Sequence, residues 1–157
     1  MKFNTKLLHG KAGRNTPDGA TLPGISQVSA FSYDSAEHLE KVFGNKSPGF
    51  AYTRIGNPTV AAFEQRINEV EGGTGAVACA SGMAAITVAL LNVLSAGDEI
   101  IAGSGLFGGT IDLFKDLEAF GITTHFIPHI TVEDIKPVLN QNIKAVFGEI
   151  IGNPGLD

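Results

Sequence analysis

The apolar and polar positions from residue 57 onward alternate between the period of helices and that of buried strands. Asn57 followed by Pro58 predicts a helix start, and apolar residues then recur at spacings of three and four until Gly72. The pattern then predicts strands over 75–80, 98–103, 122–127 and 143–150, with helices over 83–94, 111–120 and 132–140. Because parallel strands need crossover connections, normally helical and right-handed, it predicts an α/β fold: a mostly parallel sheet covered on both faces.

The first fifty residues show no sustained period and predict an extended N-terminal arm with one short helix. Residues 9–24 are rich in Gly, Pro, Asn and Asp, and Asp34 or Ser35 is the expected cap of a helix that Gly44 ends. Such an arm needs this domain or a neighbouring subunit to lie against. We therefore divide the chain into an arm over 1–50 and a domain over 51–157.

Composition narrows the class of protein. The net charge is −5 and no run of Lys or Arg occurs, which argues against a protein that binds nucleic acid. Residues 72–97 lack charge, but Gly and polar residues divide them into a strand and a helix, which argues against a membrane span. The single Cys79 excludes an internal disulfide and lies in an apolar run, so we expect a buried thiol. The N-terminus lacks the apolar core of a signal peptide, so we expect a cytoplasmic protein.

A candidate anion site lies where the strand over 75–80 gives way to the next helix. Backbone amides at a helix start are unpaired and carry the positive end of the helix dipole. Gly82 lets an oxyanion approach the backbone of Met83, while the Ser81 hydroxyl can cap the helix. A plain N-cap without a ligand explains the same residues equally well.

Two further motifs are weaker. Gly103 to Gly108 matches G-x-G-x-x-G, but no acidic residue follows at the end of the next strand, so a nicotinamide site is disfavoured. Tyr52 and Arg54 should face the same side of an extended segment, where a phenol beside a guanidinium suits a phosphate. A surface arginine next to a packing tyrosine is the alternative.

The spacing of the histidines at 125 and 129 around a strand end supports no metal site.

Four motifs in this order and spacing, YTRIGNPT, ASGMAAI, SGLFGGT and GNPGLD, resemble the pyridoxal-phosphate enzymes of cysteine and methionine metabolism. The resemblance extends over essentially the whole chain. The O-acetylhomoserine sulfhydrylase branch is most similar, followed by methionine γ-lyase, and cystathionine γ-synthase and lyase are further members. The resemblance implies the large domain of a fold-type I pyridoxal-phosphate transferase, truncated before the Schiff-base lysine.

The resemblance also implies residue roles in binding pyridoxal 5'-phosphate. Gly82 and Met83 match residues whose amides bind the cofactor phosphate, with Ser81 beside them. Tyr52 and Arg54 match a pair that reaches the phosphate bound in the neighbouring subunit. We therefore expect a homo-oligomer, a dimer that shares its active sites and usually assembles into a tetramer.

Three more candidates lie in the loops that follow strands. Asn153 matches an asparagine near the phenolic oxygen of the cofactor, and Glu149 lies close by in the same loop. Phe107 stands where many relatives have a tyrosine that stacks on the pyridine ring. Phenylalanine can still stack, but it cannot donate or accept a proton.

The catalytic residues that the family needs are expected beyond Asp157. These are the Schiff-base lysine and an aspartate that keeps the pyridine nitrogen protonated, and no lysine of this chain lies in a similar context. We expect the N-terminal part of an O-acetylhomoserine sulfhydrylase, inactive without its C-terminal part, with methionine γ-lyase and the cystathionine enzymes as alternatives. A separate polypeptide carrying the C-terminal part and a non-catalytic binding module are the remaining alternatives.

Overall fold

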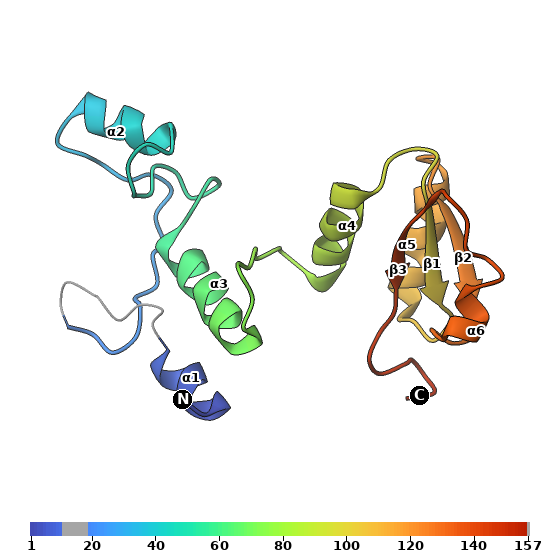
Figure 1. Ribbon diagram of the computed structural model, residues 1–157. Coiled ribbons are helices and arrows are strands. Elements are labelled where there is room, and N and C mark those ends of the chain that lie inside the picture. The colour runs from blue at the N-terminus through green and yellow to red at the C-terminus, as the bar shows by residue number, and fades with distance from the viewer. Residues whose placement is uncertain (11–18, 157) are drawn as a thin grey trace. The chain divides into compact units, whose positions relative to one another are not determined.

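The computed structural model describes residues 1–10 and 19–156, so the part of the predicted arm over 11–18 lies outside the described residues. The chain forms two compact units, Met1–Ala78 and Cys79–Asp157 (Figure 1). The expected division at residue 50 falls inside the first unit, where the Phe31 amide donates to the Ala51 carbonyl at 3.1 Å. That division stays a prediction about the complete protein.

The first unit contains the helices α1 (Phe3–His9), α2 (Ala36–Phe43) and α3 (Pro58–Glu71). Ser35 is the cap of α2, since its hydroxyl accepts a hydrogen bond from the His38 amide at 3.2 Å. The Asn57 side chain caps α3 by accepting from the Thr59 amide at 2.9 Å, and Gly72 ends that helix with φ of 68°. Both predicted helices of this unit are therefore confirmed.

Helix α1 was not predicted, because its stabilisation comes from a distant part of the chain. No side chain caps its N-terminus. At its other end, the Arg66 guanidinium of α3 donates to the carbonyls of Lys6 at 2.9 Å and Leu7 at 2.5 Å. The Lys6 carbonyl also accepts from the Gly10 amide at 2.9 Å, so the Arg66 bonds add to the last turn of the helix, and no local pattern reveals them.

The second unit alternates helices and strands as expected. Its elements are α4 (Gly82–Val93), β1 (Glu99–Gly103), α5 (Gly108–Glu118), β2 (Thr123–Ile127), α6 (Val132–Ile135) and β3 (Ile143–Phe147). The strands form one parallel sheet in the order β2-β1-β3 (Figure 1). The predicted parallel α/β architecture is confirmed.

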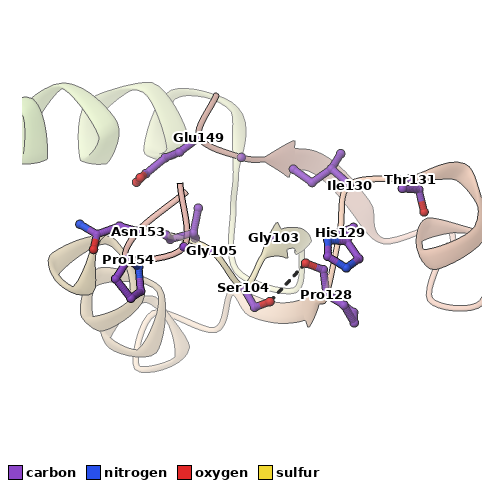
Figure 2. Close-up of a pocket in the computed structure, with 13 residues that line it drawn as sticks. Gly103, Ser104, Gly105, Pro128, His129, Ile130, Thr131, Glu149, Asn153 and Pro154 are labelled. Carbon is purple, nitrogen blue, oxygen red and sulfur yellow. Dashed lines mark hydrogen bonds between the residues drawn. The ribbon is translucent and has the colours of Figure 1, made fainter. Parts of the chain in front are cut away.

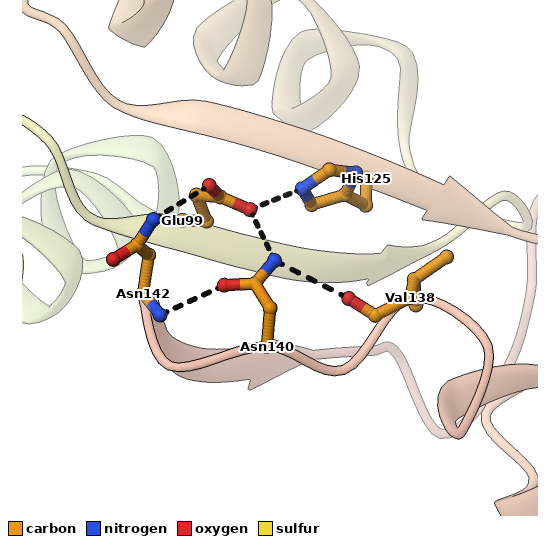
Figure 3. Close-up of polar contacts among 5 residues, drawn as sticks. All are labelled: Glu99, His125, Val138, Asn140 and Asn142. Atoms are coloured by element: carbon orange, nitrogen blue, oxygen red, sulfur yellow. Dashed lines mark hydrogen bonds and ion pairs between the residues drawn. The ribbon is translucent and has the colours of Figure 1, made fainter.

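This strand order places connections on both faces of the sheet. The chain moves outward from β1 to β2 and then back across β1 to β3, and right-handed crossovers in opposite directions use opposite faces. On one face, Phe114 of α5 packs edge-on against Phe147, with ring centroids 5.3 Å apart. On the other face, Asn140, which follows α6, donates to the Glu99 carboxylate at 2.8 Å (Figure 3).

The core lies between the sheet and the two helices α4 and α5. Phe114 and Ile100 at its centre have no exposed surface. Burial of one such side chain contributes about 1.5–3 kcal/mol relative to leaving it exposed. The other buried members come from both helices, β1 and the flanking loops: Leu90, Leu94, Ala102, Leu106, Leu117 and Ile122.

The predicted strand over 75–80 is wrong. The segment forms no ladder with β2 or β3, which are the edges of the described sheet. Val77 is 82% exposed and Cys79 is also exposed, so the expectation of a buried thiol is wrong as well. An apolar run favours a strand only where a neighbouring strand pairs with it, and within the described residues none does.

Two predicted elements end earlier than expected. Helix α6 stops at Ile135 instead of 140, because Pro137 has no amide to donate to the Glu133 carbonyl, while Lys136 keeps helical backbone with φ of −50° and ψ of −43°. Strand β3 stops at Phe147, which leaves Glu149 in the following loop. Among the described residues, no helix is long and apolar enough to cross a membrane.

Candidate functional site

The carboxyl ends of the three strands border an open cavity of about 630 Å³ (Figure 2). Its walls are the loops over 103–106, 128–131 and 148–155, which follow β1, β2 and β3. Open parallel sheets bind ligands outside the carboxyl ends of their strands, where the strand order reverses. The reversal in this sheet lies between β1 and β3, so this edge is the candidate site.

Glu149 occupies the start of α5. Its Oε1 and Oε2 lie 3.1 and 3.2 Å from the Phe107 amide nitrogen, which donates to the carboxylate. The hydroxyl of Thr110, a residue without exposed surface, lies 3.5 Å from Oε1. Phe107 is the N-cap residue of α5 but provides no side-chain cap of its own. The carboxylate of Glu149 takes that place, where the helix dipole favours negative charge.

The start of α4 lies beside the start of α5. The Thr110 hydroxyl is 4.0 Å from the Met83 sulfur. A Cβ at Gly109 would lie 3.5 Å from the same sulfur and 2.7 Å from Cε1 of Phe107. A side chain at position 109 would therefore displace the Phe107 ring. Thr110 thus lies at the centre of three residues that the sequence analysis named separately: Met83, Phe107 and Glu149.

The start of α4 is open, in contrast to that of α5. Ser81 is extended, and its hydroxyl accepts from the Ala84 amide at 3.1 Å. The amides of Gly82 and Met83 are the first two of the helix and have no acceptor within it. A Cβ at Gly82 would meet no atom within 4 Å. This helix start fits a phosphate, since it presents amides and the positive end of a dipole without a carboxylate of its own.

The same contrast argues against a nicotinamide dinucleotide in the G-x-G-x-x-G loop. A pyrophosphate binds at the start of the helix that follows such a loop. At α5 that position already holds the negative charge of Glu149, bonded to the Phe107 amide. A dinucleotide would have to displace this carboxylate.

Asn153 joins two walls of the cavity through its backbone. Its amide donates to the Gly105 carbonyl at 3.2 Å, and its side chain is exposed. Sequence reasoning missed Thr110 and also Ile130, whose side chain lies against Gly103 and Gly148 between β1 and β3. Neither residue carries a local signal, because each acts through contacts with distant segments.

Tyr52 and Arg54 belong to the first unit and face the same side, as predicted. The Arg54 guanidinium carbon is 5.2 Å from the centroid of the Tyr52 ring, within cation–π range. The segment is a turn and not extended as expected, since the amides of Ile55 and Gly56 both donate to the Tyr52 carbonyl, at 2.9 and 3.0 Å. Both side chains border an open, mainly apolar cavity of about 360 Å³.

A polar cluster at the opposite edge of the sheet fixes the amino end of β1 (Figure 3). The Glu99 carboxylate accepts from Asn140 at 2.8 Å and Asn142 at 3.2 Å, and it lies 2.5 Å from His125 Nε2. Hydrogen bonds from Asn140, His125 and Asn142 lower the pKa of Glu99 from 4.5 to about 2. This cluster joins β1, β2 and the segment before β3, away from the cavity.

Fold and site together define an α/β unit with a ligand cavity at the carboxyl edge of a parallel sheet, beside an open helix start. Residues 4–157 match the family of Cys/Met metabolism PLP-dependent enzymes, and the chain belongs to this family. The resemblance expected from the four motifs is thereby confirmed, and the family's cofactor is pyridoxal phosphate.

Curated relatives of the chain include synthases and a lyase. The chain is 40% identical to a homocysteine synthase of Schizosaccharomyces pombe, over 97% of this chain and 36% of that protein. It is also 40% identical to an O-acetyl-L-homoserine sulfhydrylase of Corynebacterium glutamicum, over 99% and 36%. An L-methionine gamma-lyase of Fusobacterium nucleatum is 36% identical, over 98% and 39%. The chain thus spans between a third and two fifths of the length of these relatives.

Solved structures with a similar fold support the same family assignment. A Campylobacter jejuni protein assigned as O-acetylhomoserine (thiol)-lyase has a TM-score of 0.90 and 32% identity, over 100% of this chain and 39% of that one, and it carries an N'-pyridoxyl-lysine-5'-monophosphate. The cystathionine gamma-lyase of Lactobacillus plantarum has a TM-score of 0.87 and 34% identity over the same shares. The predicted fold class, the large domain of a pyridoxal-phosphate transferase, is confirmed.

Proposed function

We propose that this chain is part of a pyridoxal-phosphate enzyme that replaces the acetate of O-acetylhomoserine with sulfide or a thiol. The observation that carries the proposal is the open start of α4 beside the loop that Glu149 anchors. The similarity to homocysteine synthase and O-acetyl-L-homoserine sulfhydrylase supports this choice of reaction. The gamma-lyase relative makes elimination from a sulfur amino acid the second candidate.

The residues of the second unit fit the phosphate end of the cofactor. The Gly82 and Met83 amides bind the phosphate dianion, and Ser81 holds the first turn of α4 in place by its bond to the Ala84 amide. Phe107 stacks on the ring of the cofactor, and its lack of a hydroxyl means that it moves no proton. Bound pyridoxal phosphate supplies an electron sink for the α-carbon of the substrate.

The residues of the cavity serve the other end of the cofactor. Asn153 would hold the phenolic oxygen of the cofactor from the cavity rim, where its own amide donates to the Gly105 carbonyl. The lysine that binds the cofactor covalently belongs to the remainder of the complete protein, as does the aspartate at the pyridine nitrogen. No proton transfer at the α-carbon of the substrate is therefore assigned to residues 1–157. The proposed substrate is an amino acid whose γ-substituent leaves.

Tyr52 and Arg54 bind the phosphate held by the neighbouring subunit of a dimer, which assembles further into a tetramer. The stacked pair is pre-organised, because the guanidinium lies over the phenol ring. Exposed apolar side chains flank it, Ile55 at 66% and Phe43 at 54% exposure, which fits a surface that another subunit covers.

The test compares the polypeptide of residues 1–157 with the complete protein. Intact-mass measurement first identifies every polypeptide in each sample. Homocysteine formation from O-acetylhomoserine and sulfide is then measured, with and without added pyridoxal phosphate. We expect turnover by the complete protein alone. Homocysteine formation by the isolated 16.4 kDa chain would contradict the assignment of the lysine to the remainder of the protein.

Other outcomes distinguish the alternatives. A co-purifying polypeptide that carries the lysine indicates a split enzyme. Ammonia release from methionine without a thiol acceptor favours the lyase. A complete protein that binds inorganic phosphate at α4 but no pyridoxal phosphate would overturn the proposal and favour a non-catalytic binding module.

A further inference from the structure

We propose that Glu149 is a positioning residue for Phe107 and not a ligand of the cofactor. The proposal rests on the proposed function, because it assigns Phe107 to the ring of the cofactor. Glu149 acts through the backbone of the loop that begins α5, and Thr110 holds the carboxylate in place.

Both carboxylate oxygens of Glu149 are engaged within this chain. Oε1 accepts from the Phe107 amide at 3.1 Å and lies 3.5 Å from the Thr110 hydroxyl, and Oε2 lies 3.2 Å from the same amide nitrogen. The side chain crosses from the loop after β3 to the loop after β1, over 42 residues of sequence. These charge-assisted bonds hold the carboxylate at the helix start and direct it at the Phe107 amide.

The Phe107 carbonyl accepts from the amides of Thr110 at 2.9 Å and Ile111 at 3.2 Å, whereas its side chain has few restraints. Its side chain is 52% exposed and makes no capping bond to α5. Gly109 leaves room for the ring, since a Cβ there would lie 2.7 Å from Phe107 Cε1. The bond from its amide to Glu149 holds the other side of the same peptide backbone, and with it the direction in which the ring leaves the chain.

Thr110 links this anchor to the start of α4. It has no exposed surface, and its hydroxyl lies between Glu149 Oε1 at 3.5 Å and the Met83 sulfur at 4.0 Å. The start of α4, which binds the phosphate, and the loop with the stacking ring thus keep a fixed spacing. Glu149 sets the position of the ring relative to the phosphate.

The experiment uses the complete enzyme with the substitutions Glu149→Ala, Phe107→Leu and the double variant. The dissociation constant of pyridoxal phosphate is measured by titration of the apoenzyme, and the circular dichroism of the bound cofactor reports its orientation. Without this bond the ring is no longer held in position before the cofactor binds, so Glu149→Ala should weaken binding by up to about tenfold and change the cofactor circular dichroism. In the Phe107→Leu background the same substitution should have little further effect, since both act on one contact.

Glu118→Gln is the matched control, because it removes an exposed carboxylate at the other end of α5. It should leave binding and circular dichroism unchanged. Unchanged binding in Glu149→Ala, or fully additive effects in the double variant, would overturn the proposal. Failure of the wild-type enzyme to bind pyridoxal phosphate would instead refute the proposed function.

A second pair of variants covers the case in which Glu149→Ala does not fold. Thr110→Val removes the hydroxyl at nearly constant shape, and Thr110→Ser keeps it. We expect the valine variant to weaken cofactor binding and alter its circular dichroism, and the serine variant to preserve both. Equal behaviour of the two variants would overturn the role of the Thr110–Glu149 contact.

Discussion

Replacing Gly82 with proline removes one amide from the proposed phosphate site without breaking α4. Proline is favoured at the first helical position and requires an extended residue before it. Ser81 meets that requirement with φ of −157° and ψ of 165°. A Cβ at position 82 would meet no atom within 4 Å. We therefore expect the apoenzyme to fold normally, with a stability equal to or slightly above that of the wild type.

The substitution should lower the affinity for the cofactor. A hydrogen bond to a charged acceptor contributes about 1.5–3 kcal/mol, and 1.4 kcal/mol is about tenfold in affinity. Gly82→Pro should thus bind pyridoxal phosphate about tenfold to a hundredfold more weakly than Gly82→Ala, which adds a Cβ but keeps the amide. Titration of the two apoenzymes, followed by cofactor absorbance, measures the ratio. Equal affinities in two equally stable variants would refute the use of this amide.

Three further predictions concern the shared site, the polar cluster and the core. At a pyridoxal phosphate concentration too low to load either variant, Arg54→Ala and Gly82→Pro should each be nearly inactive. Mixing them with subunit exchange should then restore about a quarter of wild-type activity if a dimer shares its sites, and no recovery would contradict sharing. Since the pKa of Glu99 is lowered to about 2, its contribution is present above pH 4.5 and lost as the pH falls toward 2. The unfolding free energy of the wild type should therefore exceed that of Glu99→Gln above pH 4.5, and the two values should become similar near pH 2. A difference that does not change with pH would contradict this. Phe114→Ala should lower the unfolding free energy by about 3–5 kcal/mol in denaturant titrations, against a small loss for the exposed Phe120→Ala, and equal losses would contradict the assignment of the core.

Elements specified by neighbouring residues could be predicted from the sequence. Asn57, Pro58 and Gly72 mark the two ends of α3 within one segment, and Ser35 marks the start of α2. Elements that depend on distant partners could not. Helix α1 depends on Arg66, which donates to the Leu7 carbonyl in its last turn from 59 residues away. The apolar run over 75–80 has the composition of a strand, but pairing decides its state, and composition says nothing about pairing.

The candidate site shows the same limit at its centre. Helices α4 and α5 both begin at a glycine after an apolar segment, so local pattern marks both starts as anion sites. They differ because β3 lies beside β1, which carries Glu149 to the start of α5 from 42 residues away. With that carboxylate in place, a second anion at α5 would meet a like charge. At α4, by contrast, the hydrogen bonds of Glu149 do not occupy the Gly82 and Met83 amides. The order of the strands therefore determines which of two similar helix starts is available to a phosphate.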